Sequence, residues 1–284
     1  MTTHKNPVTH TTLAKIIGNY DALLIDAFGV LVRGDGLLPG ALDFMAHLHK
    51  TAQPYLILTN DASRLPSQSN QWYQSLGLQI DTERIVTSGS LLTPHFTKHN
   101  LKGAPTIVLG PEGSQAYAKD AGAHIVAPDD DAAEVIAVCD DAGYPFLETI
   151  EATLSTLLRR TDGGKNTHLI LPNPDLIYPR SATEVGLTSG AVALIFEEAL
   201  KLRYPQRTDL PAFARLGKPH NPIFEAAVDK LRTRNVLMIG DQLQTDILGA
   251  NNFGIDSALV THGLTQWDER AHIRPTFLAS TPLM

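Results

Sequence analysis

The sequence predicts an α/β fold built around a largely parallel sheet, and three observations lead to this prediction. Short apolar runs alternate with longer amphipathic ones, which is typical of strands that alternate with helices. The chain has 284 residues, enough for two modest domains or one large one with a sizeable core. Hydrophobic residues make up 43% of it and charged residues 19%, which is ordinary for a soluble globular protein.

The expected strands of the larger unit are short and apolar, and amphipathic stretches lie between them. The strands are expected over residues 22–26, 55–60, 85–88, 236–240 and 257–261. The helices are expected over residues 39–50, 67–76, 189–202, 222–231 and 245–253. The expected helix termini carry typical residues: Pro39 lies near one helix start, and Gly77 and Gly254 follow two helix ends.

The middle of the chain repeats the same alternation on a smaller scale. Strands are expected over residues 106–110, 124–127, 134–140 and 168–171, with helices over 114–121 and 147–160. We therefore expect a second, smaller α/β domain at residues 101–187, inserted into a core made of residues 1–100 and 188–284.

Charge and cysteine content exclude several classes of function. The net charge of −7 argues against non-specific nucleic-acid binding, because no basic stripe is available to neutralise a phosphate backbone. The single cysteine, Cys139, cannot form an internal disulfide and is expected to be buried and structural. Residues 1–20 lack the apolar core of a signal peptide, and no apolar run approaches the roughly 20 residues of a membrane span. A cytoplasmic protein without a membrane partner is expected.

Polar residues follow three of the predicted strands at the point where each strand ends. Asp26 follows LLI, Thr59 and Asn60 follow LIL, and Asp241 follows VLMIG. Ligands of open parallel sheets bind in the crevice at the carboxyl ends of the strands. These side chains are therefore expected to define one site.

Two further segments extend this set. Lys218 stands between a glycine and a proline ahead of a predicted helix, and Thr245 and Asp246 stand near the start of the last helix, where they could also be simple caps. The carboxylates of Asp26, Asp241 and Asp246 would repel one another unless a cation joined them. Mg²⁺ suits such an oxygen donor set, whereas the absence of a Cys/His cluster disfavours zinc.

Taken in order, these segments resemble the four signature motifs of the haloacid-dehalogenase-like (HAD) superfamily. The motifs are DAFGVL from Asp26, TND from Thr59, Lys218, and GD with TD at 240–241 and 245–246. The segments LLPGALDFMAHL, LTNDASR, LPNPDLIYP and TDILGANNFGIDSALVTHG are similar to class IIA of that superfamily, the NagD-like group of predicted sugar phosphatases. The resemblance implies a Rossmann-like three-layer core with a parallel sheet and an inserted, substrate-selecting α/β cap of the C2 type.

The same resemblance implies a Mg²⁺-dependent phosphomonoester hydrolase that acts on a small phosphorylated metabolite. Asp26 would attack phosphorus and become an aspartyl-phosphate, while Thr59 and Lys218 would bind the transferring oxygens. The metal would be held by Asp26, the backbone carbonyl of Phe28, and Asp241.

The resemblance also implies supporting roles for other residues. Asp246 and Thr245 would orient the groups around the metal from behind. Residues that could contact substrate are Asn60, Asp61, Asn173 and Asp175. Cap-mediated dimers occur in the related class, so a homodimer formed through the cap is one candidate assembly.

Phe28 departs from the phosphatase pattern, which has a second aspartate at this position to protonate the leaving oxygen and then activate water. Such general acid–base help contributes roughly 10²–10⁴-fold. Three readings follow. In the first, the protein is a phosphatase whose leaving groups need little protonation, or whose acid comes from elsewhere, such as Asp61, Asp175 or a histidine. In the second, it is a weakened phosphate-binding or regulatory module. In the third, it is a dehalogenase-like hydrolase. The third reading leaves the acidic metal ligands unexplained.

Overall fold

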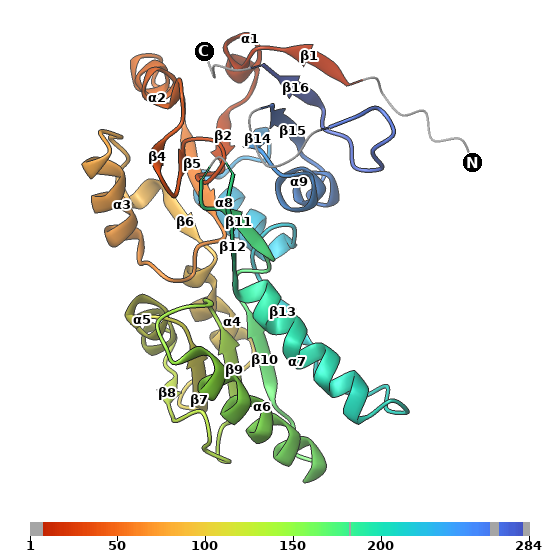
Figure 1. Cartoon of the computed structure of the whole chain (residues 1–284). Helices are drawn as coiled ribbons and strands as arrows, with labels where there is room; N and C mark the ends of the chain where they lie inside the picture. Colours follow the sequence, from red (N-terminus) through yellow and green to blue (C-terminus); the bar gives the residue numbers. More distant parts are fainter. Residues whose placement is uncertain (1–7, 182, 262–266, 281–284) are drawn as a thin grey trace.

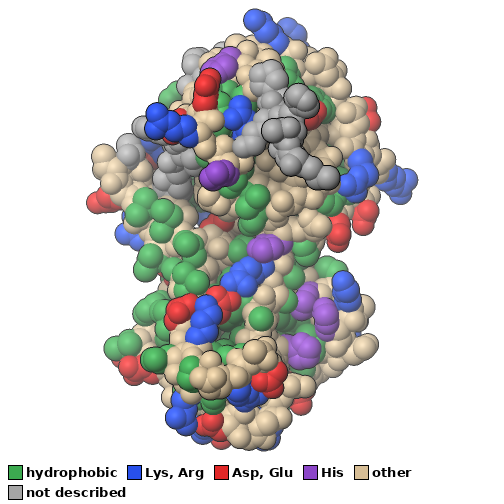
Figure 2. Space-filling view, turned by 90° about the vertical axis from the view of Figure 1, so that its right-hand side faces the viewer, with side chains coloured by type: hydrophobic (Ala, Val, Ile, Leu, Met, Phe, Trp, Pro, Cys, Tyr) green, Lys and Arg blue, Asp and Glu red, His purple; other side chains and the backbone are tan. Residues whose placement is uncertain are grey.

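The computed structural model describes residues 8–181, 183–261 and 267–280. Figure 1 shows two lobes joined by several crossings of the chain, with the larger sheet in one lobe and a smaller sheet in the other. The space-filling view in Figure 2 shows the same two lobes separated by a waist.

The larger lobe is built on a seven-stranded sheet in which every neighbouring pair of strands is parallel. Its order is β1 (Thr9–Thr11), β16 (Phe277–Ala279), β15 (Asp256–Val260), β14 (Val236–Gly240), β2 (Ala22–Ile25), β5 (Tyr55–Thr59) and β6 (Ile85–Thr87). The first and second motifs therefore leave from adjacent strands, and the fourth leaves from the strand on the other side of β2.

Helices cover both faces of this sheet, which makes the larger lobe a three-layer structure. Along β2, Leu23 and Ile25 pack in one core cluster and Leu24 packs in another, as alternation along a strand requires. The first cluster includes Phe44 of α2 and the second includes Phe224 of α8. The helices on the first side are α1 (Leu13–Ile16), α2 (Ala41–Lys50) and α3 (Pro66–Ser75), and those on the second are α8 (Asn221–Leu231) and α9 (Leu248–Phe253).

The smaller lobe is built on a five-stranded sheet, also parallel throughout. Its order is β13 (Phe213–Arg215), β10 (His168–Leu171), β9 (Val135–Val138), β7 (Pro105–Leu109) and β8 (His124–Ile125). Its helices are α5 (Glu112–Asp120), α6 (Phe146–Asp162) and α7 (Ser189–Arg203), and α4 (Leu92–Lys98), which precedes its first strand, contacts α5. Cys139 is buried and unpaired by any disulfide, at the end of β9.

The remaining elements are short. Two antiparallel hairpins occur, β3 (Val32–Arg33) with β4 (Gly36–Leu37) and β11 (Ile177–Pro179) with β12 (Val185–Leu187). Single turns of 3₁₀-helix are η1 (Ile17–Asn19), η2 (Thr82–Arg84) and η3 (Gly89–Leu91), and η4 (Leu243–Ile247) is a π-helical turn. In the part of the chain that the structure describes, no helix is long and apolar enough to cross a bilayer.

The predicted α/β class with a parallel sheet is confirmed, but one expected boundary does not match the sheets. β13 pairs with β10 of the smaller sheet, although it lies well beyond residue 187. Val192 and Phe196 of α7 pack in the apolar cluster of that same sheet. We keep the two-part division as a proposal and move its second boundary from residue 187 to the end of β13.

Candidate active site

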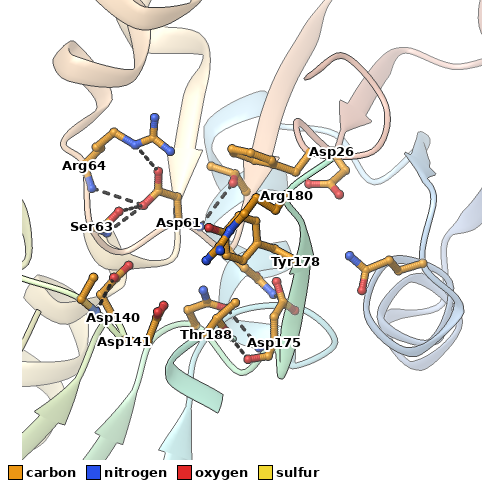
Figure 3. A pocket seen from close by; sticks show the side chains of 16 residues that line it. Asp26, Asp61, Ser63, Arg64, Asp140, Asp141, Asp175, Tyr178, Arg180 and Thr188 are labelled. Carbon is orange, nitrogen blue, oxygen red and sulfur yellow. Dashed lines mark hydrogen bonds and ion pairs between the residues drawn. The ribbon is translucent and has the colours of Figure 1, made fainter. Parts of the chain in front are cut away.

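A cavity of about 310 Å³ lies between the two lobes. The larger lobe contributes residues that follow β2 and β5, and the smaller lobe contributes the loops after β9 and β10 together with β11. In Figure 3, Asp26 and Asp61 face Asp140, Asp141 and Asp175 across this space. The cavity is lined by Asp26, Phe28, Thr59, Asn60, Asp61, Ser63, Arg64, Asp140, Asp141, Ala142, Asn173, Asp175, Tyr178, Arg180, Thr188 and Gln242.

A buried lysine links two carboxylates at the floor of this cavity. Lys218 Nζ lies 2.7 Å from Asp26 Oδ1 and 2.8 Å from Asp246 Oδ1. Asp26 is only 5% exposed and Lys218 only 2%. Because buried charges persist only when they are paired, this contact accounts for the burial of both groups.

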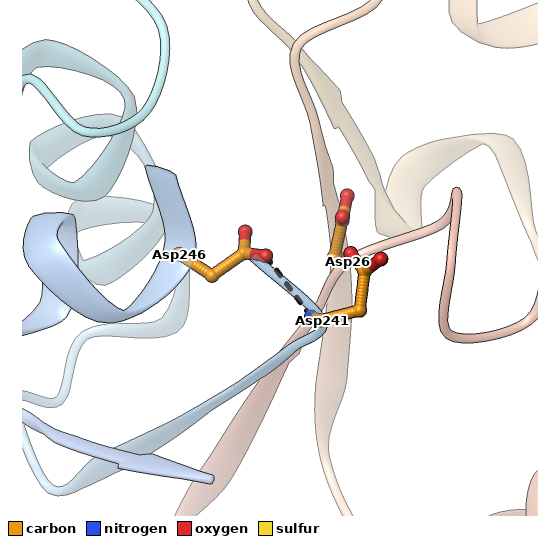
Figure 4. A group of neighbouring side chains, drawn as sticks. All are labelled: Asp26, Asp241 and Asp246. Carbon is orange, nitrogen blue, oxygen red and sulfur yellow. Dashed lines mark hydrogen bonds between the residues drawn. The ribbon is translucent and has the colours of Figure 1, made fainter. Parts of the chain in front are cut away.

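The third acidic residue, Asp241, completes a compact group with Asp26 and Asp246 (Figure 4). One carboxylate oxygen from each residue lies within 4.8 Å of the other two. Both oxygens of Asp246 are engaged, since Oδ1 is paired with Lys218 and Oδ2 accepts hydrogen bonds from the backbone N–H groups of Asp241 (3.2 Å) and Gln242 (3.1 Å).

These donors fit a hard divalent cation. They are all carboxylate oxygens, and within the described ranges no other group of three acidic, histidine or cysteine side chains is as compact. Lys218 supplies one positive charge against the three carboxylates, so a second cation would relieve the remaining repulsion. Asp26 and Asp241 are the two members of this group that the sequence analysis assigns to the metal.

For both Asp26 and Lys218, burial and the charge of the partner shift the pKa in opposite directions. Burial raises the pKa of Asp26; Lys218 counteracts this effect, and the neighbouring carboxylates of Asp246 and Asp241 add to it. Burial alone would lower the pKa of Lys218, but the charges of Asp246 and Asp26 outweigh it and raise that pKa. The lysine therefore stays protonated and holds a positive charge beside Asp26.

A tight turn after β2 brings the backbone of Gly29 against Asp241. Gly29 has φ +86°, which favours glycine, and a Cβ built there would lie 2.1 Å from Asp241 Oδ2. Its N–H donates to the carbonyl of Val32 (2.8 Å), which closes the turn. No larger residue fits here without displacing a carboxylate of the acidic group.

Asn60 fastens Lys218 to the larger lobe. Its Oδ1 accepts a hydrogen bond from the Lys218 N–H (2.8 Å), and its Nδ2 donates to the Lys218 carbonyl (2.9 Å). The same Nδ2 donates to Asp175 Oδ1 of the smaller lobe (2.9 Å). Asn60 thus joins the end of β5, the lysine segment and the loop after β10 at one point.

Asp61 organises the loop between β5 and α3. Its Oδ1 accepts hydrogen bonds from Ser63 N (2.7 Å), Ser63 Oγ (2.7 Å) and Arg64 N (3.2 Å). Its Oδ2 accepts a bond from Arg64 Nε (3.1 Å). Both oxygens of this carboxylate are therefore engaged with its own loop.

Phe28 belongs to an aromatic group at the edge of the cavity. Its ring stacks on Trp72, with centroids 5.7 Å apart and planes 13° apart, and meets Tyr178 edge-on at 6.4 Å. The guanidinium of Arg64 lies 4.8 Å from the Trp72 ring centre and 6.0 Å from that of Phe28. Phe28 is thus fixed by packing, and it offers no proton to a ligand.

The structure brings the sequence-predicted site residues to one place, although their roles remain predictions. Asn173 forms the expected turn, since its Oδ1 accepts a bond from Asp175 N (3.0 Å), and it also lines the cavity. Of the predicted site residues, those that line the cavity are Asp26, Phe28, Thr59, Asn60, Asp61, Asn173 and Asp175. Those buried behind it are Lys218, Asp241, Thr245 and Asp246.

Sequence reasoning missed the contribution of the smaller lobe beyond Asn173 and Asp175. Asp140 and Asp141 follow β9, and Tyr178 and Arg180 are on or just after β11. The rule that ligands meet strand ends would have found the acidic pair if it had been applied to the smaller sheet. Tyr178 stands in the segment LPNPDLIYP that resembles the family, but no role was assigned to it, and nothing in the sequence pattern singled out Arg180.

Comparison with known proteins identifies the family. A model for haloacid dehalogenase-like hydrolases matches residues 23–124, and a second model, for HAD-hydrolase-like sequences, matches residues 215–281. A solved structure from Cytophaga hutchinsonii, described as a possible sugar phosphatase, is 32% identical with a TM-score of 0.81, and the match covers 96% of this chain and 98% of that one. The chain belongs to the haloacid dehalogenase-like hydrolases.

Relatives within these hydrolases are phosphatases by name. The acid sugar phosphatase of Staphylococcus haemolyticus is 28% identical over 253 residues, which is 88% of this chain and 89% of that protein. The dihydroxyacetone phosphatase of Corynebacterium glutamicum is 27% identical over 262 residues, which is 91% of this chain and 88% of that protein. The predicted family is confirmed, and the protein is a hydrolase of this fold.

Proposed function

We propose that this hydrolase is a Mg²⁺-dependent phosphomonoesterase that acts through an aspartyl-phosphate on Asp26. The observation that carries the proposal is the placement of Asp26. Its carboxylate is paired with Lys218 at 2.7 Å and lines the cavity between the lobes. A nucleophile held in this way can attack the phosphorus of an ester that enters from the cavity.

The metal would be held by Asp26, the backbone carbonyl of Phe28, and Asp241. When bound, Mg²⁺ neutralises charge between the carboxylate and the phosphoryl group, so that the two anions can approach. Asp246 and Thr245 would position these groups from behind.

The protein's own residues would do the rest of the work. Thr59, which is buried at the end of β5 and lines the cavity, would donate to a phosphoryl oxygen. Lys218 would offset the charge that develops on these oxygens in the transition state, and Asn60 would hold Lys218 in position.

The substrate would be a small phosphorylated metabolite. A cavity of about 310 Å³ holds a small molecule. The names of the relatives, which include sugar and dihydroxyacetone phosphatases, support the same class. Asn60, Asp61, Asn173 and Asp175 would form the walls that the substrate meets, with Asp61 acting through the loop that it organises.

A homodimer through the smaller lobe and a cytoplasmic location form part of the same proposal. Apolar side chains of the β11–β12 hairpin are exposed, among them Val185 (53%) and Leu187 (58%). Single exposed apolar side chains are normal, but several gathered on one short hairpin are typical of an interface. The single buried, disulfide-free Cys139 agrees with a reducing compartment.

Release of phosphate from an aryl phosphate tests the proposal. The wild type should release phosphate with Mg²⁺ and stop when a chelator is added. The variant Asp26→Asn should be inactive while keeping a normal unfolding temperature. If wild type and Asp26→Asn are equally silent, but a phosphate analogue still raises the unfolding temperature, the protein is a binding module. Halide release that ignores the chelator would identify a dehalogenase instead.

A further inference from the structure

The reaction proposed above lacks a proton donor at position 28, and the geometry limits where another donor can stand. In phosphoryl transfer the attacking and leaving oxygens lie roughly in line. With Asp26 attacking from the larger lobe, the leaving oxygen faces away from it, toward the wall of the cavity that the smaller lobe provides. A donor that replaces the missing acid therefore has to lie on that wall.

Most acidic candidates are occupied or face elsewhere. Asp61 accepts four hydrogen bonds from its own loop, which favours its ionised form. Among the residues that line the cavity, none is a histidine. Asp140 accepts a bond from Ala142 N (3.0 Å), and Figure 3 places Asp140 and Asp141 together on the side of Asp61 and Ser63, apart from Asp175.

Asp175 differs from these candidates in its anchoring. Its backbone is fixed by three bonds: its N–H donates to Asn173 Oδ1 (3.0 Å), and its carbonyl accepts from Gly190 N (3.0 Å) and from Thr188 Oγ1. Its Oδ1 accepts from Asn60 Nδ2 (2.9 Å), and no described residue donates to its Oδ2. The side chain is held by one oxygen while the other remains for a ligand in the cavity.

We propose that Asp175 of the smaller lobe is the proton donor to the leaving oxygen, in the place that Phe28 cannot fill. This inference rests on the proposed function. Asn60 binds both Asp175 and the backbone of Lys218, whose Nζ contacts Asp26, so the donor and the nucleophile are positioned by one network.

The phosphate ester is hydrolysed in two half-reactions. Asp26 Oδ forms a bond to phosphorus, the bond from phosphorus to the ester oxygen breaks with its electron pair staying on that oxygen, and the Asp175 proton moves to it, giving an alcohol. Water then attacks phosphorus and gives a proton to the Asp175 carboxylate. The bond from phosphorus to Asp26 breaks, inorganic phosphate leaves, and both aspartates return to their starting states.

The charges around Asp175 agree with this role. Burial raises the pKa of Asp175 to about 6; Lys218 and the bond from Asn60 counteract the effect, and Asp246 adds to it. These are the charged groups that act on Asp175 from the lysine segment and from η4. An acid with this pKa is protonated in a substantial fraction of molecules at mildly acidic pH, and it loses its proton as the pH rises through 6.

The variant Asp175→Asn tests the proposal with two kinds of ester. Asparagine keeps an Oδ1 that accepts from Asn60, so the network can persist while the proton is lost. Because an alkoxide needs a proton and 4-nitrophenolate does not, kcat/KM should fall roughly 10²–10⁴-fold for an alkyl phosphate and less than about fivefold for 4-nitrophenyl phosphate. Asp140→Asn is the matched control on the same wall and should change both values by the same factor.

The pH dependence and a double variant give independent readouts. For the alkyl ester, the ratio of wild-type to Asp175→Asn kcat/KM should be largest below pH 6 and should shrink above it; titration of the substrate cancels in this ratio. Adding Phe28→Asp to Asp175→Asn should restore turnover of the alkyl ester. If Asp175→Asn lowers kcat/KM of both esters by the same factor, or leaves the pH profile of kcat/KM unchanged, Asp175 is not the donor.

The controls separate this inference from the proposed function. Wild type that releases no phosphate from 4-nitrophenyl phosphate with Mg²⁺ would overturn the proposed function, and the assignment of Asp175 with it. Wild type that does release it, together with an Asp175→Asn variant that fails to distinguish the two esters, would overturn only the role of Asp175.

Discussion

Residue 28 decides how this site differs chemically from a phosphatase with two aspartates in its first motif. Phe28 keeps the backbone carbonyl that a metal would use, but it replaces a proton donor by a ring that stacks on Trp72. The ring is also part of a group with Tyr178 and Arg64, so its position is fixed by several neighbours. An aromatic ring held by its neighbours therefore occupies the position of the missing acid.

Restoring an aspartate at this position should change turnover. Phe28→Asp, made in the Asp175→Asn background, is expected to raise kcat/KM for alkyl phosphates by roughly tenfold or more, since a well-placed general acid contributes roughly 10²–10⁴-fold. The same change removes an aromatic pair that contributes about 0.5–1.5 kcal/mol, so the unfolding temperature should fall slightly. Steady-state kinetics with an alkyl ester measures the effect, and Phe28→Leu is the control that removes the ring without adding an acid. Unchanged or lower turnover would show that the acid does not limit the reaction.

Several individual residues of the site could be predicted from the sequence, and the reason is local. Asp26, Thr59 and Asp241 each follow an apolar strand of the same parallel sheet, and the carboxyl ends of such strands meet. Tyr178 and Arg180 could not be predicted, because the hairpin that carries them is only three residues long on each side and has no distinctive periodicity. Their place depends on how the two lobes meet.

At the scale of single elements, the turn after β2 ties the backbone to the acidic group. Gly29 has a positive φ and stands against Asp241, as described above. This turn also carries Phe28, whose carbonyl is a proposed metal ligand. The conformation of one short turn thus sets the position of two of the three proposed ligands.

Gly29→Ala should weaken metal binding more than it weakens the fold. The added Cβ would meet Asp241 Oδ2 and would strain a backbone with φ +86°. The Mg²⁺ concentration that gives half-maximal activity should rise at least about tenfold, while the unfolding temperature without metal changes modestly. The matched control is Gly36→Ala, at another positive φ where a Cβ meets nothing within 4 Å. Equal Mg²⁺ requirements for the two variants would contradict this role of Gly29.

Elements in the middle of the sheets were predicted more accurately than those at the edges. β2 and β14 are buried along their whole length, so they appear as continuous apolar runs. β1 and β13 have only three residues each, and all three residues of β1 carry polar side chains, so no pattern distinguishes them from loops. The expected helix over 245–253 is a π-helical turn followed by α9, a difference that periodicity does not resolve.

At the scale of the whole molecule, the smaller lobe is both a wall of the site and a candidate surface for assembly. β11 carries Tyr178 into the cavity and pairs with β12, whose Val185 and Leu187 are exposed. Leu194 and Ile195 of the adjoining α7 are also more than a third exposed. A second copy of the chain that covered this hairpin would stabilise a segment that shapes the cavity.

A dimer is therefore the expected state in solution. Sedimentation equilibrium should give twice the chain mass at micromolar concentration, and Val185→Asp with Leu187→Asp should give a monomer, because two charges at an apolar interface are costly to bury. The matched control is Leu202→Asp, an exposed residue at the far end of α7, which should remain dimeric. A monomeric wild type would exclude this assembly.

The proposed reaction requires Asp26, whose carboxylate lines the cavity between the two lobes, to accept the phosphoryl group from the substrate. Acid-quenching the enzyme during turnover of 4-nitrophenyl phosphate and mapping its peptides by mass spectrometry tests this directly. With Mg²⁺, a phosphoryl group should be found on the peptide that contains Asp26, and it should be absent with a chelator and in Asp26→Asn. Phosphate release that continues in Asp26→Asn, or a phosphoryl group on another residue, would contradict Asp26 as the nucleophile.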